Sequence, residues 1–588
     1  MSLSPSQVIV LATPVFFLLI GVEYAWGLAR RRNTYRLNDA VTSIGLGMLS
    51  QISAVLTRLF RIGIYTAVYE AVAVIHNDGF WTAWYGWLLA LVFYDLCYYW
   101  LHRAGHEVAV FWAAHVVHHQ SQDYNLSTAL RQTSSGALLG WIFYLPMAVA
   151  GVPPLVFGIV ALVDLLYQFW VHTEHVPKLG WFDRWFCSPS NHRVHHAVND
   201  GYLDRNYGGV LIVWDRLFGS FKEEGEKCVY GTRSPLDSWD PLWSNAEVYW
   251  ALAKDSWHAR SWADKVRVWF KPPGWRPPDV AARFPKPPFD IAQVKTFHPP
   301  MTPTLALFAG LQFVALLGGV VVFLWHADTM PAAVSAVWLA ALAAILWSVG
   351  AVMQGRITML EVLAIEAAAL ATATGATGMT GWHQVFKPLT MVLALAYVVR
   401  AGGHGLLLAA FVFSLVGDVF LMLPGRFIPG LVSFLVAHLF FVALFKRGVP
   451  WFASRRALAC TLGAAALMYA VLFPNLPPVL KVAVACYALV IAAMAAQAIG
   501  RGPLGVAAGA VLFMLSDSLL AINKFAVPLP MAQFFVLATY YAAQLLFAHH
   551  AVIPAQAGIQ ESLDPRLLGD GDHSENNSPA LFGGTTPR

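Results

Sequence analysis

Long apolar runs recur along this chain of 588 residues and restrict what it can fold into. Several of them reach the roughly 20 apolar residues that a helix needs to cross a bilayer. Apolar residues make up 58% of the chain and charged residues only 12%, which excludes an ordinary soluble domain. In hydrocarbon every backbone amide must bond within its own segment, so such runs predict helices. We therefore expect an all-α, multi-pass integral membrane protein.

Histidines gather in four clusters that abut these apolar runs, and the clusters hold half of the chain's 20 histidines. Residues three and four positions apart share one face of a helix, so each cluster can aim two or three imidazoles at one point. Neutral imidazole binds iron, zinc, copper and nickel well. The candidate metal ligands are His102, His106, His115, His118, His119, His172, His192, His195 and His196.

This ligand set exceeds what one ion needs, because a zinc site takes at most four protein ligands. Two metal ions are the natural number. Ligands rich in nitrogen and poor in carboxylate suit a pair of irons that binds dioxygen, although the same spacing also suits zinc. A single histidine pair near a membrane is more often a hydrogen-bonded structural feature. Repetition beside apolar helices favours metal, because polar groups at membrane depth are costly and usually functional.

The apolar runs and the arginines between them predict the topology. The expected spans are 8–29, 39–60 and 83–101, followed by a hairpin of 137–152 and 154–171. Arg30, Arg31 and Arg32 follow the first span and predict that this end faces the cytoplasm. Counting spans from there brings all four histidine clusters to one cytoplasmic face. The lack of an organelle signal, with the first span retained as an anchor, favours a bacterial inner membrane, and a eukaryotic endoplasmic reticulum is the alternative.

Two aspartates precede histidines at helical spacing. Asp95 lies seven residues before His102, and Asp164 lies eight before His172. Metal-bound histidines commonly donate their second N–H to a carboxylate or a carbonyl, so both aspartates are candidates to orient ligands. The alternative is a buried polar residue satisfied by a neighbouring helix.

The histidine motifs resemble the fatty acid hydroxylase and sterol desaturase superfamily of membrane di-iron oxygenases, and within it most closely the alkylglycerol monooxygenases. The resemblance covers about residues 10–225. The stretches that carry it are His102–Glu107, Asp123–Gln132, Tyr167–Glu174, Ser190–His196 and Asn206–Asp215. Glu107 and Glu174 fall where that family has acidic residues beside its ligands, which makes Glu107 a candidate catalytic residue. His175 is extra to the pattern.

The resemblance implies an activity and its cofactors. Hydroxylation of the carbon beside an ether oxygen gives an unstable hemiacetal, which collapses to a fatty aldehyde and a glycerol derivative. The family implies two irons, dioxygen, a membrane lipid substrate and tetrahydrobiopterin as reductant. The box spacing is shared across the superfamily, so hydroxylation or desaturation of a sterol, an acyl chain or a carotenoid is the alternative. A zinc-dependent hydrolase is a further one.

Residues 226–300 differ from the rest of the chain in being rich in tryptophan, basic residues and proline. Tryptophan with lysine and arginine is typical of segments at the membrane interface. We expect a cytoplasmic cap and linker that ends the first domain, 1–225. A structural lid is its simplest role, and lining a pterin or headgroup site is the alternative.

Residues 301–552 form a second apolar domain with about eight expected spans. Charged and titratable side chains are sparse there, and the exceptions are Lys387, Asp418, His438 and Asp517. A charge at the bilayer centre costs ~3 kcal/mol even on the lenient insertion scale. The two aspartates are therefore expected to be paired or to face a wet cavity. Residues 553–588, rich in Gly, Pro, Ser and Asn, are expected to be disordered.

This second domain resembles the lysoplasmalogenase-like YhhN membrane proteins over about 310–550. The matching stretches are Lys387-Pro388, Gly417-Asp418, Phe434–His438, Gly509–Phe513 with Ser516-Asp517, and Tyr540–Gln544. The family implies hydrolysis of the vinyl ether bond of lysoplasmalogens, which also releases a fatty aldehyde.

Vinyl ether hydration begins with protonation of carbon and needs a strong, positioned acid. Two nearby carboxylates cannot both ionise easily, so one holds a proton near neutral pH. Asp418 and Asp517 are the candidate pair, and Lys387 is a candidate for holding a phosphate or headgroup. A non-catalytic scaffold or transporter is the alternative for this half. The net charge of +5 is dispersed and does not suggest nucleic acid.

Overall fold

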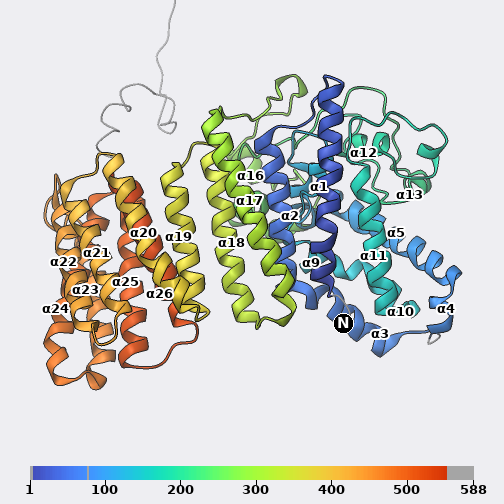
Figure 1. The fold of residues 1–588 in the computed structure, drawn as a ribbon. Coiled ribbons are helices and arrows are strands. Elements are labelled where there is room, and N and C mark those ends of the chain that lie inside the picture. Colours follow the sequence, from blue (N-terminus) through green and yellow to red (C-terminus); the bar gives the residue numbers. More distant parts are fainter. Residues whose placement is uncertain (1–3, 76–77, 553–588) are drawn as a thin grey trace, which may run out of the picture. The chain divides into compact units, whose positions relative to one another are not determined.

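The computed structural model describes residues 4–75 and 78–552, and within them it is almost entirely helical (Figure 1). The described residues contain no strand, only two isolated β-bridges, Phe186 with Leu211 and Ala197 with Tyr230. The predicted all-α fold is confirmed. The tail predicted to be disordered, 553–588, lies outside the described residues.

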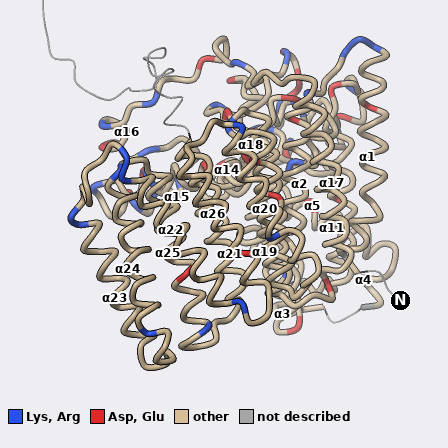
Figure 2. The backbone as a smooth tube through the Cα atoms, turned by 60° about the vertical axis from the view of Figure 1, so that its left-hand side comes forward, with Lys and Arg blue, Asp and Glu red and all other residues tan. Residues whose placement is uncertain are grey.

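Ten described helices are long and apolar enough to cross a membrane by length and composition. They are Ser6–Ala29, Leu37–Arg58, Pro303–Thr329, Ala332–Met353, Met359–Ala376, Gly405–Met422, Phe427–Lys446, Arg455–Asn475, Pro478–Arg501 and Leu504–Phe525. Figure 2 shows charged residues mostly at helix ends and in connecting segments, with long uncharged helix bodies between them. The multi-pass architecture expected from the sequence is confirmed.

The chain forms two compact units. Among the described residues, the first comprises 4–393 and 529–538, and the second comprises 394–528 and 539–552. Helices α20 (Thr380–Arg400) and α26 (Ala532–Val552) each contribute to both. The predicted domain boundary at residue 301 stays a prediction, because compact packing and common descent need not divide a chain at the same place.

In the first unit, α2 (Leu37–Arg58) is a central helix with half of its apolar window buried. Helices α17 (Pro303–His326) and α18 (Ala332–Met353) pack on it and share one hydrophobic core. Gly45 allows close approach, since a Cβ there would lie 2.7 Å from Leu346 Cδ1. Helix α1 (Pro5–Ala29) packs against α17. This packing joins residues beyond 301 to the first unit.

A second core of this unit holds the helices that lead to the histidines. Helix α5 (Trp84–Glu107) packs against α11 (Pro154–Trp170) and α10 (Leu145–Ala150). The predicted hairpin turns at Gly151, where φ is 92° and a Cβ would lie 2.2 Å from Ile75 O, so the turn requires glycine. The predicted span 83–101 corresponds to α5, which is outside the ten membrane-length helices. Gly136–Ala150, which ends in α10, and Pro154–Trp170, which is α11, are shorter apolar helices.

The cap and linker segment is more helical than its prolines suggest. It contains α14 (Pro241–His258), α15 (Trp262–Phe270) and α16 (Pro278–Arg283), with prolines at the first turns of α14 and α16. Asp240 caps α14 by accepting hydrogen bonds from two backbone amides at 2.9 Å. Trp257 and Trp262 are each 81% exposed, as expected for a segment that meets the membrane interface.

The second unit is a bundle of α21 (Gly405–Met422), α22 (Phe427–Lys446), α23 (Arg455–Leu472), α24 (Pro478–Arg501) and α25 (Leu504–Phe525), with the ends of α20 and α26. Its core is aromatic, with Phe411, Phe441, Phe513 and Phe547 fully buried. Glycine lets α21 approach α22 closely, because a Cβ on Gly417 would lie 2.7 Å from the Phe434 ring.

Candidate metal centre

The nine histidines predicted as ligands form two groups in the first unit. One group comprises His102, His106, His115, His119 and His195, and the other comprises His118, His172, His192 and His196. Within each group the possible ligand atoms all lie within 4.8 Å of one another. All of these side chains are buried except that of His115, which is partly buried. His175 belongs to neither group.

Each group draws on three elements. The end of α5 supplies two histidines, the short helix α7 (Val116–His119) with its preceding residue supplies three, and α12 (Pro189–His196) supplies three. His172 follows the end of α11. α12 is buried throughout and is capped at its N-terminus by Ser188, whose side chain accepts from Asn191 N. Asn191 then donates to Asp183 O and Phe186 O, which fixes this helix against the preceding loop.

Backbone carbonyls fix the orientation of four imidazole rings through Nδ1. His102 is 2.8 Å from Tyr207 O, His118 is 3.0 Å from Arg131 O, His172 is 2.8 Å from Gln168 O, and His195 is 3.0 Å from Arg205 O. A carbonyl carries no proton, so Nδ1 must donate in each case. In a neutral imidazole Nε2 then presents a lone pair.

These orientations bring lone pairs together. His118 Nε2 and His172 Nε2 are 3.1 Å apart, and both rings use Nδ1 to donate to carbonyls. Neither nitrogen can donate to the other in the neutral form, so the contact is repulsive unless a cation lies against both. Burial lowers the pKa of His118 to about 4 and holds the pKa of His172 well below its usual value. A proton is therefore a poor cation for this pair near neutral pH, whereas a metal ion fits it.

In the first group, His195 also presents a buried Nε2 lone pair. Its Nδ1 donates to Arg205 O, and its buried Nε2 has no hydrogen-bond partner among the described residues. His102 Nε2, another lone pair, faces His115 Nε2 at 3.1 Å. The donor chemistry of both groups therefore suits a metal ion.

Asp95 and Asp164 do not accept the histidine N–H groups, because backbone carbonyls do. The two aspartates instead bond to residues that hold those carbonyls in place. Asp95 accepts from Val210 N (2.7 Å), Leu211 N (3.0 Å) and Trp214 Nε1 (2.9 Å). That loop also carries Tyr207, the carbonyl partner of His102. Asp164 accepts at 2.5 Å from Gln168 Nε2, and the Gln168 carbonyl holds His172.

Glu107 lies at the edge of the first group and is not part of it. Its carboxylate accepts from Arg103 Nε at 2.9 Å and from Tyr207 OH at 3.4 Å, and its side chain is 43% exposed. The Tyr207 ring is 5.5 Å from that of His106. Glu107 thus reaches the histidines through Tyr207, and its catalytic role stays a prediction. Glu174 pairs with Arg32 at 3.1 Å.

Sequence reasoning missed Glu23 and Arg131. Glu23 of α1 is buried and accepts from Leu126 N at 2.8 Å and from the hydroxyls of Tyr35 and Thr173, the residue after His172. A lone carboxylate inside the run 8–29 was the signal for it. Arg131 is 1% exposed and donates to Val117 O at 2.8 Å, so it holds the backbone just before His118, and its own carbonyl faces His118 Nδ1 at 3.0 Å.

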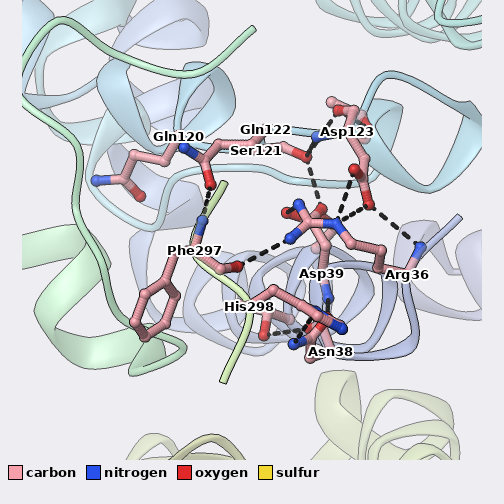
Figure 3. A network of polar contacts seen from close by, with 12 residues as sticks. Arg36, Asn38, Asp39, Gln120, Ser121, Gln122, Asp123, Phe297 and His298 are labelled. Carbon is pink, nitrogen blue, oxygen red and sulfur yellow. Dashed lines mark hydrogen bonds and ion pairs between the residues drawn. The ribbon is translucent and has the colours of Figure 1, made fainter. Parts of the chain in front are cut away.

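A polar network fixes the loop that follows His119 (Figure 3). Arg36 donates through Nε to Asp123 Oδ1 at 2.9 Å and through Nη1 to Phe297 O at 2.8 Å. Ser121 Oγ donates to Asp39 Oδ1 at 2.6 Å. Burial, and then the nearby Asp39 carboxylate, raise the pKa of Asp123 to about 7 against the opposing effect of Arg36. The network joins the start of α2, the histidine loop and the linker.

In the second unit each predicted aspartate contacts a tyrosine of its own. Asp418 on α21 accepts from Tyr540 OH at 2.6 Å. Asp517 on α25 accepts from Tyr487 OH, and its Oδ2 lies 3.3 Å from His438 Nε2. Lys387 is buried in the part of α20 that belongs to the first unit. Their catalytic roles stay predictions.

Comparisons with known proteins match both halves of the chain. The model of the family described as fatty acid hydroxylase matches residues 87–220, and the YhhN family model matches 382–551. An alkylglycerol monooxygenase from Danio rerio is 37% identical over 317 residues, which is 52% of this chain and 68% of the relative. The human alkylglycerol monooxygenase is 39% identical over 268 residues, 45% of this chain and 59% of the relative.

The second half has relatives of a different kind. The human lysoplasmalogenase TMEM86B is 40% identical over 177 residues, 29% of this chain and 76% of that protein. The Sus scrofa lysoplasmalogenase TMEM86B is 38% identical over 161 residues, 27% of this chain and 70% of that protein. No solved structure matches the chain.

Proposed function

This chain belongs to the alkylglycerol monooxygenase family and, in its second half, to the lysoplasmalogenase family, and on that premise we propose that it degrades glycerol ether lipids at two sites. The first site cleaves saturated alkyl ethers and the second cleaves alkenyl ethers. Both reactions release a fatty aldehyde, so one membrane protein would process both classes of ether lipid.

At the first site the proposed reaction inserts one oxygen atom of dioxygen into the C–H bond beside the ether oxygen. Two electrons and two protons reduce the other oxygen atom to water. The hemiacetal then collapses to a fatty aldehyde and an alcohol. A pair of irons with a two-electron donor would supply the activation of dioxygen that this chemistry needs.

The observation that carries this proposal is the contact between His118 Nε2 and His172 Nε2, which are 3.1 Å apart and both present a lone pair. The two groups of nitrogen ligands support it. The nine histidines would hold two ions, with the carbonyls that accept their Nδ1–H bonds keeping the rings in place. Burial of the histidines excludes bulk water from the site. We assign Glu107, which meets Tyr207 OH, to proton transfer at its edge.

Tetrahydrobiopterin is the proposed electron donor, as the resemblance of the first half to the alkylglycerol monooxygenases implies. It would supply the two electrons that reduce the second oxygen atom to water.

We further propose that the metal centre faces the cytoplasm of a bacterial inner membrane. Arg30, Arg31 and Arg32 follow α1 directly, which supports a cytoplasmic position for that end. The exposed Trp257 and Trp262 of the cap would then lie at the cytoplasmic membrane interface.

At the second site the proposed reaction is hydration of the vinyl ether of a lysoplasmalogen. Asp418 and Asp517 are the proposed acid–base carboxylates of this site. Lys387, which belongs to the first unit, stays a separate candidate for holding a phosphate or headgroup. A proton adds to the vinyl carbon, water adds to the carbon that carries the ether oxygen, and the resulting hemiacetal collapses. This hydration consumes only water and needs no electron donor.

Product analysis on purified protein tests both proposals. With an alkylglycerol, dioxygen and tetrahydrobiopterin, we expect a fatty aldehyde, and His118→Ala should abolish it. With a lysoplasmalogen in D₂O, we expect the aldehyde to carry one deuterium on the carbon next to the carbonyl. An oxidised product that retains the intact ether skeleton would contradict the first proposal, and an unchanged alkenyl substrate would contradict the second.

A further inference from the structure

We propose that Asp517, Tyr487 and His438 form a proton relay in which Asp517 is the catalytic acid of the second site. This inference rests on the proposed alkenyl ether hydrolysis and assigns different roles to the two aspartates. Tyr487 and His438 act as positioning residues that hold and return the proton.

Three helices of the second unit bring the cluster together. Asp517 lies on α25, Tyr487 on α24 and His438 on α22. Tyr487 OH donates to Asp517 Oδ2. His438 Nε2 lies 3.0 Å from Tyr487 OH and 3.3 Å from Asp517 Oδ2. One ring nitrogen thus contacts both oxygens, so a proton can pass among all three groups.

The other ring nitrogen of His438 indicates that the cluster takes a further ligand. His438 is fully buried, and its Nδ1 has no hydrogen-bond partner among the described residues. In either neutral tautomer Nδ1 is a buried donor or a buried lone pair. Buried polar groups are rarely left unsatisfied, so a water molecule or a substrate atom is expected there.

The two aspartates differ in how much of their side chains is exposed. The side chain of Asp517 is 19% exposed, whereas Asp418 is buried and its Oδ2 accepts from Tyr540. A carboxyl that protonates a carbon must reach the substrate, and Asp517 has the accessible surface to do so. Phe513 stacks edge-on against His438 at 4.6 Å and gives the cluster an apolar wall suited to an alkenyl chain.

The proposed step balances without any other reactant than water. The Asp517 carboxyl gives its proton to the vinyl carbon, and the double-bond electrons form the new C–H bond. The ether oxygen stabilises the resulting cation, and water adds to the carbon attached to that oxygen. The proton that water loses passes to His438 and back to Asp517. The hemiacetal then breaks its C–O bond to give aldehyde and alcohol.

The test uses the full-length protein, a lysoplasmalogen in detergent micelles, and the variants Asp517→Asn, Tyr487→Phe and His438→Gln. Tyr469→Phe is the matched control, because among the described residues Tyr469 OH donates to a backbone carbonyl, that of Lys481, at 3.1 Å. For each protein we would measure kcat, KM, the pH–rate profile and the thermal unfolding midpoint.

We expect Asp517→Asn to lower kcat by about 100-fold or more, the usual contribution of a general acid. Tyr487→Phe and His438→Gln should lower kcat with KM little changed, and they should shift the pH–rate profile. The control should match wild type. A purely structural role would lower the unfolding midpoint and leave the pH profile in place, and that result would overturn the relay.

The two levels of the proposal fail differently. An active wild type whose Tyr487→Phe and His438→Gln variants keep its kcat and pH profile would overturn the relay and leave the hydrolase intact. A wild-type protein that releases no aldehyde from the alkenyl substrate would overturn the hydrolase itself, and the relay with it.

Discussion

Replacing Asp95 with asparagine should weaken metal binding although Asp95 touches no histidine. Its carboxylate accepts three hydrogen bonds, two at Oδ2 from Leu211 N and Trp214 Nε1 and one at Oδ1 from Val210 N. Asparagine has one acceptor oxygen. Keeping that oxygen at the position of Oδ2 places the new NH₂ group against Val210 N–H, so one hydrogen bond is lost and one buried donor is left without a partner.

The magnitude follows from those contacts. A hydrogen bond to a charged group is worth about 1.5–3 kcal/mol, and with the weakening of the other two we expect about 2–4 kcal/mol of local destabilisation. The loop concerned carries the Tyr207 carbonyl that orients His102. Changes behind metal ligands typically cost about 10–100-fold in metal affinity, and we expect Asp95→Asn to fall in this range.

Iron affinity, measured by competition with a chelator, is the assay. Asp290→Asn is the control, because Asp290 also accepts a hydrogen bond from a backbone amide, Ala292 N, but does so locally in an exposed part of the linker. Asp95→Asn with the iron affinity and unfolding midpoint of wild type would refute the inference that this carboxylate holds the ligand loop.

Three further predictions concern parts of the first unit that support the site. Gly151→Ala should destabilise the protein by about 1–3 kcal/mol from its positive φ alone, with the clash against Ile75 O in addition, and thermal unfolding measures it. Glu23→Gln should lower iron affinity, because the amide cannot accept from both Leu126 N and Thr173 Oγ1; an unchanged affinity would contradict the role given to Glu23. The pKa of Asp123, raised by burial to about 7, means that the folded state holds this proton more tightly than the unfolded chain, so its stability contribution is present below about pH 4 and is lost as pH rises toward 7. Asp123→Asn should therefore flatten the fall of the unfolding midpoint between about pH 4 and pH 7, and an identical slope would count against it.

Sequence spacing predicted which histidines converge but not how they divide. The pairs His115 with His119 and His192 with His196 are four residues apart and stay in one group each, while His118 and His195 join the opposite group. Successive residues turn by about 100° around a helix, so the side chains of the adjacent histidines His118 and His119, or His195 and His196, leave the helix in directions about 100° apart. One short helix can therefore serve two ions, but only the packing of α5, α7 and α12 decides which.

The partners of the ligands could not be read from the sequence. Aspartates at helical spacing suggested carboxylates as acceptors, yet the histidines donate to the carbonyls of Tyr207, Arg131 and Gln168. Every residue has a carbonyl, so no residue type marks such an acceptor. The aspartate–tyrosine contacts of the second unit are likewise long-range, since Asp418 and Tyr540 are 122 residues apart.

The apolar runs predicted the membrane-length helices better than any residue type predicted the partners of the ligands. Eight of the ten membrane-length helices lie in 303–525, as the composition of that half predicted. The division into compact units was not predictable, because it depends on α17 and α18 packing against α2, far away in the sequence.

The central claim is that the two histidine groups each hold one iron, and counting metal in the purified protein tests it most directly. Elemental analysis combined with Mössbauer spectroscopy of protein loaded with ⁵⁷Fe would give both the number and the coupling of the ions. We predict about two irons per chain in nitrogen-rich coordination, with fewer in His172→Ala. A single ion per chain, or zinc in both groups of an active enzyme, would contradict this claim.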